Sequence, residues 1–290
     1  MTRKISKVLI VYKKSSYQEH ALDEKDENYL RLIREQSIVI KRSKSTHDVH
    51  LESLETVKSQ LSHLQIPYAL RLRTDLSPIK GYDLVLTIGG DGTFLETSHY
   101  INDGLLLGIN SVPTESVGYY CKATAENFLE KMYAYLEGRS KIQKLHRLRL
   151  EIDGQLQFPL ALNDLLFANQ NPAGTTRYVL KIGNKKEEQK SSGLWVSAAP
   201  GSTAATKSSG GRALPLSSDK IQYVIREPYA PPGKKYKLLK GILPAKQKIE
   251  ILSMMDDASI FVDGPHQTYT IRRGSLITIR NAASPIQAIW

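Results

Sequence analysis

The sequence contains one glycine-rich segment that also holds an acid, Gly-Gly-Asp-Gly-Thr at residues 89–93, directly after the apolar run at residues 83–88. Glycines let the backbone turn tightly, and they let phosphate oxygens approach the amide groups without meeting a Cβ atom. A helix that begins at such a turn directs the positive end of its dipole at the same anion. The segment therefore predicts a phosphate site, whose candidate residues are Gly89, Gly90, Gly92 and Thr93.

Asp91 is the unusual member of this segment, because the negative charge of phosphate repels a carboxylate. Its presence at a phosphate site therefore suggests a chemical role. It could accept a proton from an attacking hydroxyl group, or it could help to hold a metal ion. The alternative is a structural turn in which Asp91 only caps the following helix. The apolar strand expected before the segment favours phosphate chemistry, but not a Walker A loop, because no Gly-Lys-Ser/Thr follows.

Two further segments place small or polar residues directly after apolar runs. Residues 200–205, Pro-Gly-Ser-Thr-Ala-Ala, follow the run at residues 194–197 and suit a ligand packed closely on the backbone at the start of a helix. The amide and the carboxylate of Asn163 and Asp164 suit the recognition of ribose hydroxyl groups. Taken alone, the first segment is better explained as a flexible loop and the pair as a turn.

The composition narrows the class of protein. The single cysteine, Cys121, rules out an internal disulfide and a cysteine-cluster metal site, which fits a reducing cytoplasm. The seven histidines show no metal-binding spacing, and no run of about 18 apolar residues indicates a transmembrane helix. The net charge of +11 is dispersed, so a solvated surface or a phosphate-rich ligand explains it, and we expect neither nucleic acid nor a membrane as partner.

The first half of the chain alternates the strands and helices that would position these residues. Strands are predicted at residues 7–12, 68–73, 83–88 and 105–109, and helices at residues 17–36, 48–64, 93–101 and 125–136. The run at residues 83–88 is typical of a strand buried on both faces. The alternation predicts an α/β domain, a parallel sheet with helices on both faces, over residues 1–143.

After about residue 143 the pattern changes to short strands, which predicts a β-rich domain built as a sandwich or as stacked sheets. Asp153 and Gly154 lie between two alternating segments and predict a hairpin. Further strands are predicted at residues 178–182, 194–197, 221–225, 248–252, 260–262 and 276–279.

The set of motifs, in this order, resembles the NAD kinase family, whose members use ATP or polyphosphate. The first motif is shared with lipid kinases and phosphofructokinases, and the Gly-Ser-Thr-Ala segment narrows the resemblance to NAD kinases. Details at residues 110–118, 189–194 and 225–228 look most like the mitochondrial-type branch, and without a transit peptide we expect a bacterial relative of it. The matching positions are residues 89–93, 108–110, 163–164, 201–204 and 263–264.

The resemblance implies a β-rich domain over residues 144–269 that contributes to NAD binding, and a segment, residues 270–290, that packs back on the first domain. It implies transfer of the terminal phosphoryl group of ATP, polyphosphate or another donor to the 2′-hydroxyl of the adenosine ribose of NAD, with Mg²⁺ or another divalent cation accompanying ATP. Asp91 is then the candidate general base or hydroxyl-orienting residue. The residues implied to face NAD are Asn110, Asn163, Asp164, Gly201, Ser202, Thr203, Ala204, Ala205 and Asp263.

Two positions depart from the pattern of the family. Asp164 stands where glutamate is usual, and Ala205 stands where an aromatic residue is usual, so both bear on substrate preference more than on the type of reaction. Two other functions stay open, a lipid or other small-molecule kinase that shares the glycine-rich segment and a non-catalytic sensor of NAD or NADP. We also expect a homodimer or higher oligomer, with which an apolar strand ending at Trp290 is compatible.

Overall fold

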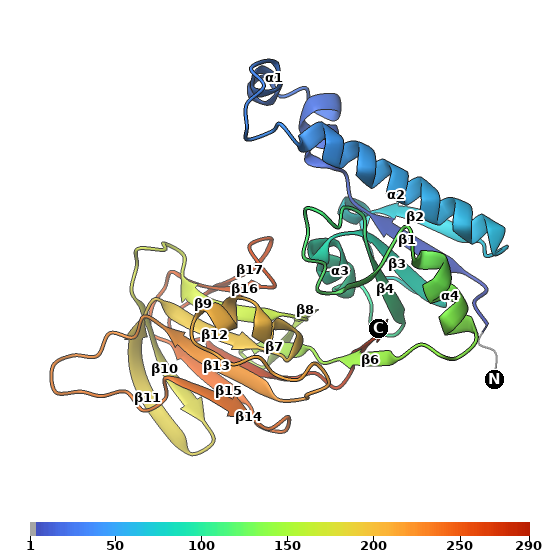
Figure 1. The fold of residues 1–290 in the computed structure, drawn as a ribbon. Helices are drawn as coiled ribbons and strands as arrows, with labels where there is room; N and C mark the ends of the chain where they lie inside the picture. The colour runs from blue at the N-terminus through green and yellow to red at the C-terminus, as the bar shows by residue number, and fades with distance from the viewer. Residues whose placement is uncertain (1–3) are drawn as a thin grey trace. The chain divides into compact units, whose positions relative to one another are not determined.

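The computed structural model describes residues 4–290 and divides the chain into two compact units (Figure 1). The first unit comprises Met1–Gln143 and Gln287–Trp290, and the second comprises Lys144–Ile286. Each unit has a hydrophobic core of its own. Within residues 4–290, no helix combines the length and the apolar character that crossing a membrane requires.

The first unit is built on a seven-stranded sheet in the order β2-β1-β3-β4-β19-β6, with β5 paired to β4. Strands β2, β1, β3 and β4 pair in parallel, as do β4 with β5 and β4 with β19. Every residue of β3 and β4 is buried, which confirms the predicted parallel sheet. The strands are β1 (Val8–Tyr12), β2 (Tyr68–Leu72), β3 (Leu84–Gly89), β4 (Leu105–Asn110), β5 (Cys121–Thr124), β6 (Ile142–Leu145) and β19 (Ile286–Ile289).

Helices cover both faces of this sheet. Val57 of α2 (Ser43–His63) and Phe128 of α4 (Phe128–Leu136) share one core cluster with the sheet residues Leu107 and Ile109. Gly108 points the opposite way, because side chains alternate along a strand. A Cβ atom there would lie 3.1 Å from the ring of Phe94 in α3 (Asp91–Ser98), so α3 covers the second face.

The prediction of one continuous helix over residues 17–36 is wrong. The structure has a π-helix, η1 (Tyr17–Asp23), and a separate helix, α1 (Glu27–Arg34). Lys25 adopts a φ of 52°, and the carboxylate of Asp26 accepts the amide of Tyr29 at 2.6 Å, which starts a new helix. α1 buries no residue, so no packing opposes the break. In addition, α2 begins at Ser43 rather than at residue 48.

The second unit consists of two antiparallel six-stranded sheets, in the orders β11-β10-β15-β18-β7-β8 and β14-β13-β12-β9-β16-β17. Tyr178 and Ile251 from the first sheet and Phe167 and Val196 from the second belong to one core cluster, so the sheets pack face to face as predicted. The strands are β7 (Leu148–Ile152), β8 (Gln155–Ala161), β9 (Asp164–Asn169), β10 (Thr176–Ile182), β11 (Lys185–Ser191), β12 (Gly193–Ser197), β13 (Ile221–Arg226), β14 (Lys240–Leu243), β15 (Ile249–Ser253), β16 (Ala258–Val262), β17 (Gln267–Ile271) and β18 (Leu276–Asn281).

The hairpin predicted at residues 153–154 joins β7 to β8, and both turn residues have positive φ, 50° at Asp153 and 80° at Gly154. A helical segment does begin at Pro200, as the sequence predicts, but it is short and divided into two pieces. The chain there forms a 3₁₀ turn, η3 (Pro200–Thr203), and a four-residue helix, α5 (Ala205–Ser208). Pro200 suits the first turn, but Ala204 leaves the helical region, with ψ of −135°, and separates the two pieces.

The segment that returns to the first unit is shorter than residues 270–290. β18 pairs with β15 and β7 inside the second unit, and only Gln287–Trp290 belong to the first. β19 lies between β4 and β6 in the sheet order, and Ile286, Ala288 and Ile289 are each 1% exposed. The apolar end of the chain is therefore an inner strand and not a surface for a second copy, while the oligomeric state stays a prediction.

Candidate functional site

The glycine-rich turn lies at the carboxyl end of β3 and opens α3. Gly89 is the last residue of β3, Gly90 caps α3, and Asp91 is its first helical residue. The amide of Thr93 donates to the carbonyl of Gly90 at 3.0 Å, so the helix starts directly from the turn. Parallel α/β sheets bind ligands outside the carboxyl ends of their strands, where the first turn of a helix presents N–H groups. The turn therefore has the position and the backbone donors of an anion site.

The packing of this unit leaves no room for a side chain at Gly89, whereas a side chain at Gly90 would meet only the hydroxyl of Ser116 and one at Gly92 would meet no close atom. A Cβ atom on Gly89 would lie 2.4 Å from Oγ1 of Thr93, and one on Gly90 would lie 2.8 Å from Oγ of Ser116. The nearest atom to a Cβ on Gly92 lies 3.9 Å away, which is an ordinary contact distance. Gly92 is also exposed, so the chain leaves its outer side open to a ligand.

Thr93 lies beneath the turn rather than on its outer side. Its side chain is 1% exposed, and its Oγ1 atom is buried without a hydrogen-bond partner among the described residues. Its carbonyl accepts the hydroxyl of Thr97 at 2.7 Å. In this conformation the hydroxyl of Thr93 faces the protein, and a contact with phosphate requires its side chain to rotate.

Asp91 is held by two backbone amides of a loop that is distant in sequence. The amide of Tyr119 donates to its Oδ2 atom at 2.8 Å, and the amide of Tyr120 donates to its Oδ1 atom at 2.7 Å. The cap of α3 is Gly90, so the alternative in which Asp91 caps this helix is wrong. Each carboxylate oxygen has a second lone pair, which can accept a further donor such as a hydroxyl group.

Two aromatic rings hold an ammonium group in the same region. Nζ of Lys122 lies 4.1 Å from the ring centroid of Trp290 and 5.5 Å from that of Tyr119. Burial lowers the pKa of Lys122, and the charge of Asp91 opposes that shift. Burial, and next the charge of Asp91, raises the pKa of Cys121 to about 12, so this thiol is not ionised near pH 7. Asp91 therefore has a cation near it and no thiolate.

Two further cations border the turn, and sequence reasoning missed both. Lys13 follows β1, and its Cγ atom lies 3.6 Å from the place of a Cβ on Gly89. Arg73 follows β2, and its Nη1 atom lies 3.9 Å from the place of a Cβ on Gly92, while its Nε atom pairs with Glu96 at 3.1 Å. Burial, and next the charge of Arg73, lowers the pKa of Lys13. The signal that could have found them is their position, because each directly follows a parallel strand.

Asn110 ends β4 and shapes the loop that follows. Its Nδ2 atom donates to the carbonyl of Ser116 at 3.1 Å, and its Oδ1 atom accepts the amide of Val112 at 3.2 Å. Gly118, with a φ of 61°, passes so close that a Cβ there would lie 2.6 Å from Nδ2 of Asn110. Both ends of this side-chain amide bond to the backbone of the following loop, so Asn110 holds in place the loop that leads to Tyr119.

In the second unit, one carboxylate organises the turn at residues 162–164. Oδ1 of Asp263 accepts the amides of Asn163 at 2.7 Å and Asp164 at 3.0 Å, and its Oδ2 accepts the amide of Leu162 at 2.8 Å. Asp263 has a φ of 52°, and its own amide donates to the carbonyl of Asp164 at 3.0 Å. The structure thus brings together Asn163, Asp164 and Asp263, three of the residues implied to face NAD. Asp263 accepts hydrogen bonds from the backbone amides of the other two.

Asp164 is a buried carboxyl group beside that charge. Its side chain is 6% exposed, and burial, followed by the charge of Asp263, raises its pKa to about 7. Across the sheet it pairs with Ser197, whose Oγ atom is buried without a hydrogen-bond partner among the described residues. Near neutral pH, Asp164 can donate a hydrogen bond when protonated and accept one when ionised, so it suits a ligand hydroxyl in either state.

Gly201 and Ser202 build the start of the η3 turn rather than its surface. A Cβ on Gly201 would lie 2.0 Å from the carbonyl oxygen of Asn163, so only glycine fits there. The buried hydroxyl of Ser202 donates to the carbonyl of Ala199 at 2.7 Å and accepts the amide of Leu214 at 2.8 Å. The absence of a side chain at Gly201 therefore lets η3 pack closely against the turn at Asn163. Within the second unit, the Gly-Ser-Thr-Ala motif and the Asn163–Asp164 pair lie next to each other.

The outer residues of the same segment have the opposite character. Thr203 and Ala204 are exposed, and Ala205 is half-buried. Behind them Thr206 is fully buried, and its Oγ1 atom has no hydrogen-bond partner among residues 4–290. Of this motif, Thr203, Ala204 and Ala205 are the residues whose side chains a ligand can reach.

The chain matches proteins of one family. A family model described as the ATP-NAD kinase N-terminal domain matches residues 8–140. A probable NADH kinase from Oryza sativa subsp. japonica is 35% identical over 265 residues, which cover 83% of this chain and 81% of that protein. An NADH kinase from Arabidopsis thaliana is 33% identical over 269 residues, which cover 84% of each chain.

Solved structures show the same fold. The crystal structure of an NAD kinase from Archaeoglobus fulgidus in complex with ATP has a TM-score of 0.70 at 19% identity, covering 98% of this chain and 93% of that chain. That of yeast NADH kinase complexed with NADH has a TM-score of 0.69 at 18% identity, covering 99% and 84%. These likenesses confirm the predicted combination of an α/β unit with a β-rich unit.

Proposed function

The chain belongs to the NAD kinase family, and from that premise we propose that it transfers the terminal phosphoryl group of ATP to the 2′-hydroxyl of the adenosine ribose of NAD, which makes NADP. Family membership makes the chain a kinase that acts on NAD, as predicted. The plant relatives, both named as NADH kinases, fit the predicted mitochondrial-type branch, so NADH is a second acceptor to test.

The observation that carries the proposal is the place of Asp91. Its carboxylate stands at the first position of α3, directly after the two glycines that open the anion site, and two amides fix its orientation. An oriented carboxylate beside a phosphate site can accept the proton of an attacking hydroxyl or align that hydroxyl for attack. Lys13, Arg73 and Lys122 supply positive charge around the same turn.

In the proposed step, the 2′-hydroxyl oxygen forms a bond to the terminal phosphorus of ATP. The bond from that phosphorus to the bridging oxygen breaks, and ADP leaves with the electron pair. The hydroxyl proton passes to Asp91 and from there to solvent. Catalysis of this kind depends on in-line positioning and on charge neutralisation, which cations around a glycine-rich turn provide.

A divalent cation fits this site as a companion of the phosphates. No group of three or more His, Cys, Asp or Glu side chains that could hold a metal occurs among residues 4–290. Magnesium is commonly held by substrate phosphates with only one or two carboxylates, and Asp91 is the carboxylate that the turn offers. Bound in this way, the ion would neutralise charge on the transferred group.

The second unit supports NAD as the acceptor. The Asn163 turn, the buried Asp164 and the exposed Thr203 and Ala204 form a small-residue surface with hydroxyl-binding groups. The missing aromatic side chain at Ala205 leaves the adenine without a stacking partner at that position. We propose that these residues bind the adenosine half of NAD.

The decisive experiment measures NADP formation by the purified protein with NAD or NADH, a donor and Mg²⁺. We expect ATP to support turnover, and we expect Asp91→Asn to lower kcat by about 100-fold or more, since a positioned base typically contributes that much. If the wild-type protein makes no NADP or NADPH from ATP or from polyphosphate, the proposed function is wrong. Full activity of Asp91→Asn would instead remove the role given to that carboxylate.

A matched control separates chemistry from folding. An Asn at position 91 has only one acceptor oxygen for the two amides of Tyr119 and Tyr120, so part of the loop contact is lost. Melting temperatures of Asp91→Asn and of Asp103→Asn, which changes an exposed aspartate elsewhere in the unit, are therefore compared. A folded Asp91→Asn protein with kcat lowered by about 100-fold or more, beside a normally active Asp103→Asn, is the expected result.

A further inference from the structure

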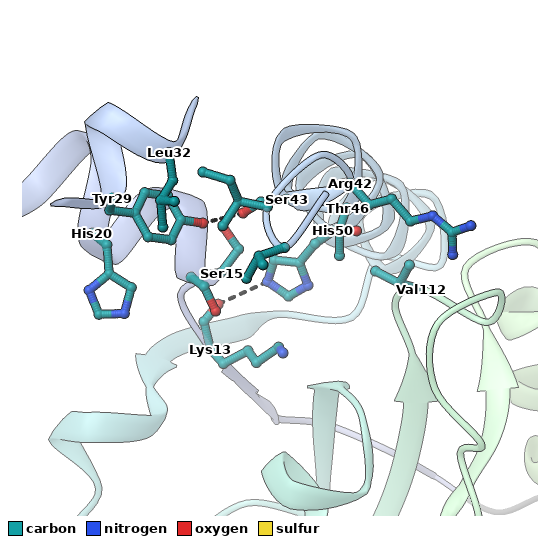
Figure 2. A pocket seen from close by; sticks show the side chains of 13 residues that line it. Lys13, Ser15, His20, Tyr29, Leu32, Arg42, Ser43, Thr46, His50 and Val112 are labelled. Carbon is teal, nitrogen blue, oxygen red and sulfur yellow. Dashed lines mark hydrogen bonds between the residues drawn. The ribbon is translucent and has the colours of Figure 1, made fainter. Parts of the chain in front are cut away.

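The loop between β4 and β5 is fixed at its start by hydrogen bonds. The hydroxyl of Ser111 donates to Nδ1 of His50 at 2.8 Å, and Nε2 of the same ring donates to the carbonyl of Lys13, also at 2.8 Å (Figure 2). Burial lowers the pKa of His50, which favours this neutral form of the ring. The carbonyl of Ser111 accepts the hydroxyl of Ser53 at 2.8 Å. The start of the loop is therefore tied both to α2 and to the residue that follows β1.

The other end of this loop carries two tyrosines, whose backbone amides hold Asp91. The ring of Tyr120 is buried and stacks on Phe94 of α3, with the ring centroids 5.1 Å apart and the planes 7° apart. Its carbonyl oxygen lies 2.7 Å from the place of a Cβ on Gly108 of β4, so the backbone also packs closely there. The ring of Tyr119 is only half-buried and meets the ring of Tyr120 edge-on. Packing within the sheet and α3 thus fixes Tyr120 more firmly than Tyr119.

A third ring, that of Trp290, lies against Tyr119. The two ring centroids are 6.4 Å apart and the planes meet at 76°, which is an edge-to-face contact. Nζ of Lys122 lies 4.1 Å from the ring centroid of Trp290 and 5.5 Å from that of Tyr119. Because the face of an aromatic ring attracts a cation, this one ammonium group holds both rings. Trp290 and Lys122 therefore give Tyr119 the support that its partial burial does not.

The sheet explains why Trp290 reaches this loop. β3 occupies one edge of β4, and β19 and β5 pair with the other edge, both in parallel. Ala288 of β19 pairs with Leu106, so by the same register Trp290 comes to the level of Gly108. Cys121, the first residue of β5, pairs with that same glycine. β19 thus ends where β5 begins, and Trp290 meets the loop at the point where the loop enters β5.

We propose that Trp290 is a positioning residue for the phosphoryl transfer. Through Tyr119 and Lys122 it holds the loop in place, and the amides of that loop orient Asp91. The inference rests on the proposed function, and it adds a residue that none of the predicted motifs contains. Trp290 is itself held, because its amide donates to the carbonyl of Lys141 at 2.9 Å. Without its ring the carboxylate would be less well aligned, and small misalignments of a reacting group slow a reaction strongly.

The first test compares three variants of β19 and the residue after it. We expect Trp290→Ala to lower kcat for NADP formation about tenfold or more and to leave KM for ATP within about twofold. Trp290→Phe should restore most of kcat, because a phenyl ring also offers a face to the ammonium group. Gln287→Ala changes an exposed position of β19 and should match the wild type. A Trp290→Ala protein with a lower melting temperature but wild-type kcat would overturn the inference, since the ring would then serve stability alone.

A double-mutant cycle tests whether the effect passes through Asp91. Two changes that act through the same group are not additive, whereas independent changes are. We therefore expect Trp290→Ala to lower kcat much less in the Asp91→Asn protein than in the wild type. An equal fold-loss of kcat in both backgrounds would show that Trp290 acts independently of this carboxylate, and the inference would fail.

Amide hydrogen exchange measures the same link without any turnover. The amides of Tyr119 and Tyr120 are hydrogen-bonded to Asp91, so loosening of the loop exposes them to solvent. We expect both amides to exchange about tenfold faster or more in Trp290→Ala, while the amide of Leu86 in the buried strand β3 keeps its rate. Unchanged exchange at both tyrosines would overturn the inference. Faster exchange in a protein that makes no NADP would retain the link to Asp91 and reject the proposed function.

A further variant guards against a folding defect in Trp290→Ala. Trp290→Leu keeps an apolar side chain beside Tyr119 but offers no ring face to the ammonium group of Lys122. It should lower kcat and speed the exchange of the same two amides in the direction expected for the alanine variant. A folded Trp290→Leu protein with wild-type kcat and wild-type exchange would overturn the inference.

Discussion

At the scale of single residues, the two units use aspartates in contrasting ways. Asp91 and Asp263 are both held by backbone amides, which orient the carboxylate. Asp164 is buried next to Asp263, and its pKa is raised to about 7. The structure therefore pairs an anchored carboxylate with one whose charge changes near neutral pH, which residue identity alone does not reveal.

This pKa makes the stability of the ligand-free protein depend on pH. Because burial raises the pKa of Asp164 from 3.8 in the unfolded chain to about 7, the folded state binds more protons between these values, and stability falls as pH rises through that window. Asp164→Asn removes the titration. We expect the variant to be more stable than the wild type at pH 8, by at most about 4 kcal/mol, and to show no such gain at pH 4.

Urea unfolding at several pH values measures this difference. Asp219→Asn, which changes an exposed aspartate in the same unit, serves as the control and should show no pH-dependent gain. A gain for Asp164→Asn that is equal at pH 4 and pH 8 would show that its carboxyl group is not the cause. In the same assay, KM for NAD of the wild type should change between pH 6 and pH 8, whereas that of Asp164→Asn should not.

At the scale of elements, the glycines where β3 meets α3 differ in how much room the fold leaves for a side chain. Gly89→Ala would place a Cβ 2.4 Å from Oγ1 of Thr93, so we expect a loss of about 1–3 kcal/mol of stability. Gly92→Ala meets no close atom, and alanine favours a helix by up to about 1 kcal/mol. If phosphate lies against Gly92, this variant keeps its stability and loses activity by about tenfold or more.

Thermal melting and NADP formation, measured on both variants, distinguish these effects. Gly81→Ala is no substitute as a control, because Gly81 has a φ of 76°, which strains any other residue. Ser45→Ala, an exposed helical position without a predicted role, is the better comparison. Full activity of a stable Gly92→Ala protein would mean that no phosphate approaches the outer side of Gly92.

Elements with strong local signals were predictable, and those set by context were not. β3 and β4 are continuous apolar runs and were found within a residue or so of their bounds. β11 carries six charged or amide residues in a row, from Lys185 to Lys190, and lies at the edge of its sheet, where Lys185, Lys186 and Glu188 are exposed. The predicted helix at residues 17–36 was broken by the capping contact of Asp26, which competes with helical periodicity.

At the scale of the whole molecule, the net charge of +11 bears on substrates that are polyanions. Attraction between a basic protein and ATP or NAD is screened by salt, with a Debye length of about 10 Å at 0.1 M. We expect KM for ATP to rise severalfold between 0.05 and 0.3 M NaCl while kcat changes little. A series at constant salt with added sucrose controls for osmolality, and a KM that does not respond to NaCl would exclude long-range attraction.

Local patterns in the sequence were enough to predict most of the strands and helices, the change to short strands near residue 143, and the two motifs of small residues at residues 89–93 and 201–204. These depend on local patterns of apolar and small residues, which persist in any fold that uses them. The resemblance to NAD kinases rested on the same local patterns, and the plant relatives bear it out.

The contact partners of those residues became clear from the three-dimensional fold and not from the sequence. The amides of Tyr119 and Tyr120 on Asp91, the carboxylate of Asp263 under Asn163, and the approach of Lys13 to Gly89 join residues that are far apart in the chain. Such contacts follow from the register of strands and the path of loops, which no local pattern encodes. The cavity that Lys13, Tyr29, Thr46 and Val112 line (Figure 2) also joins residues from separate segments of the chain.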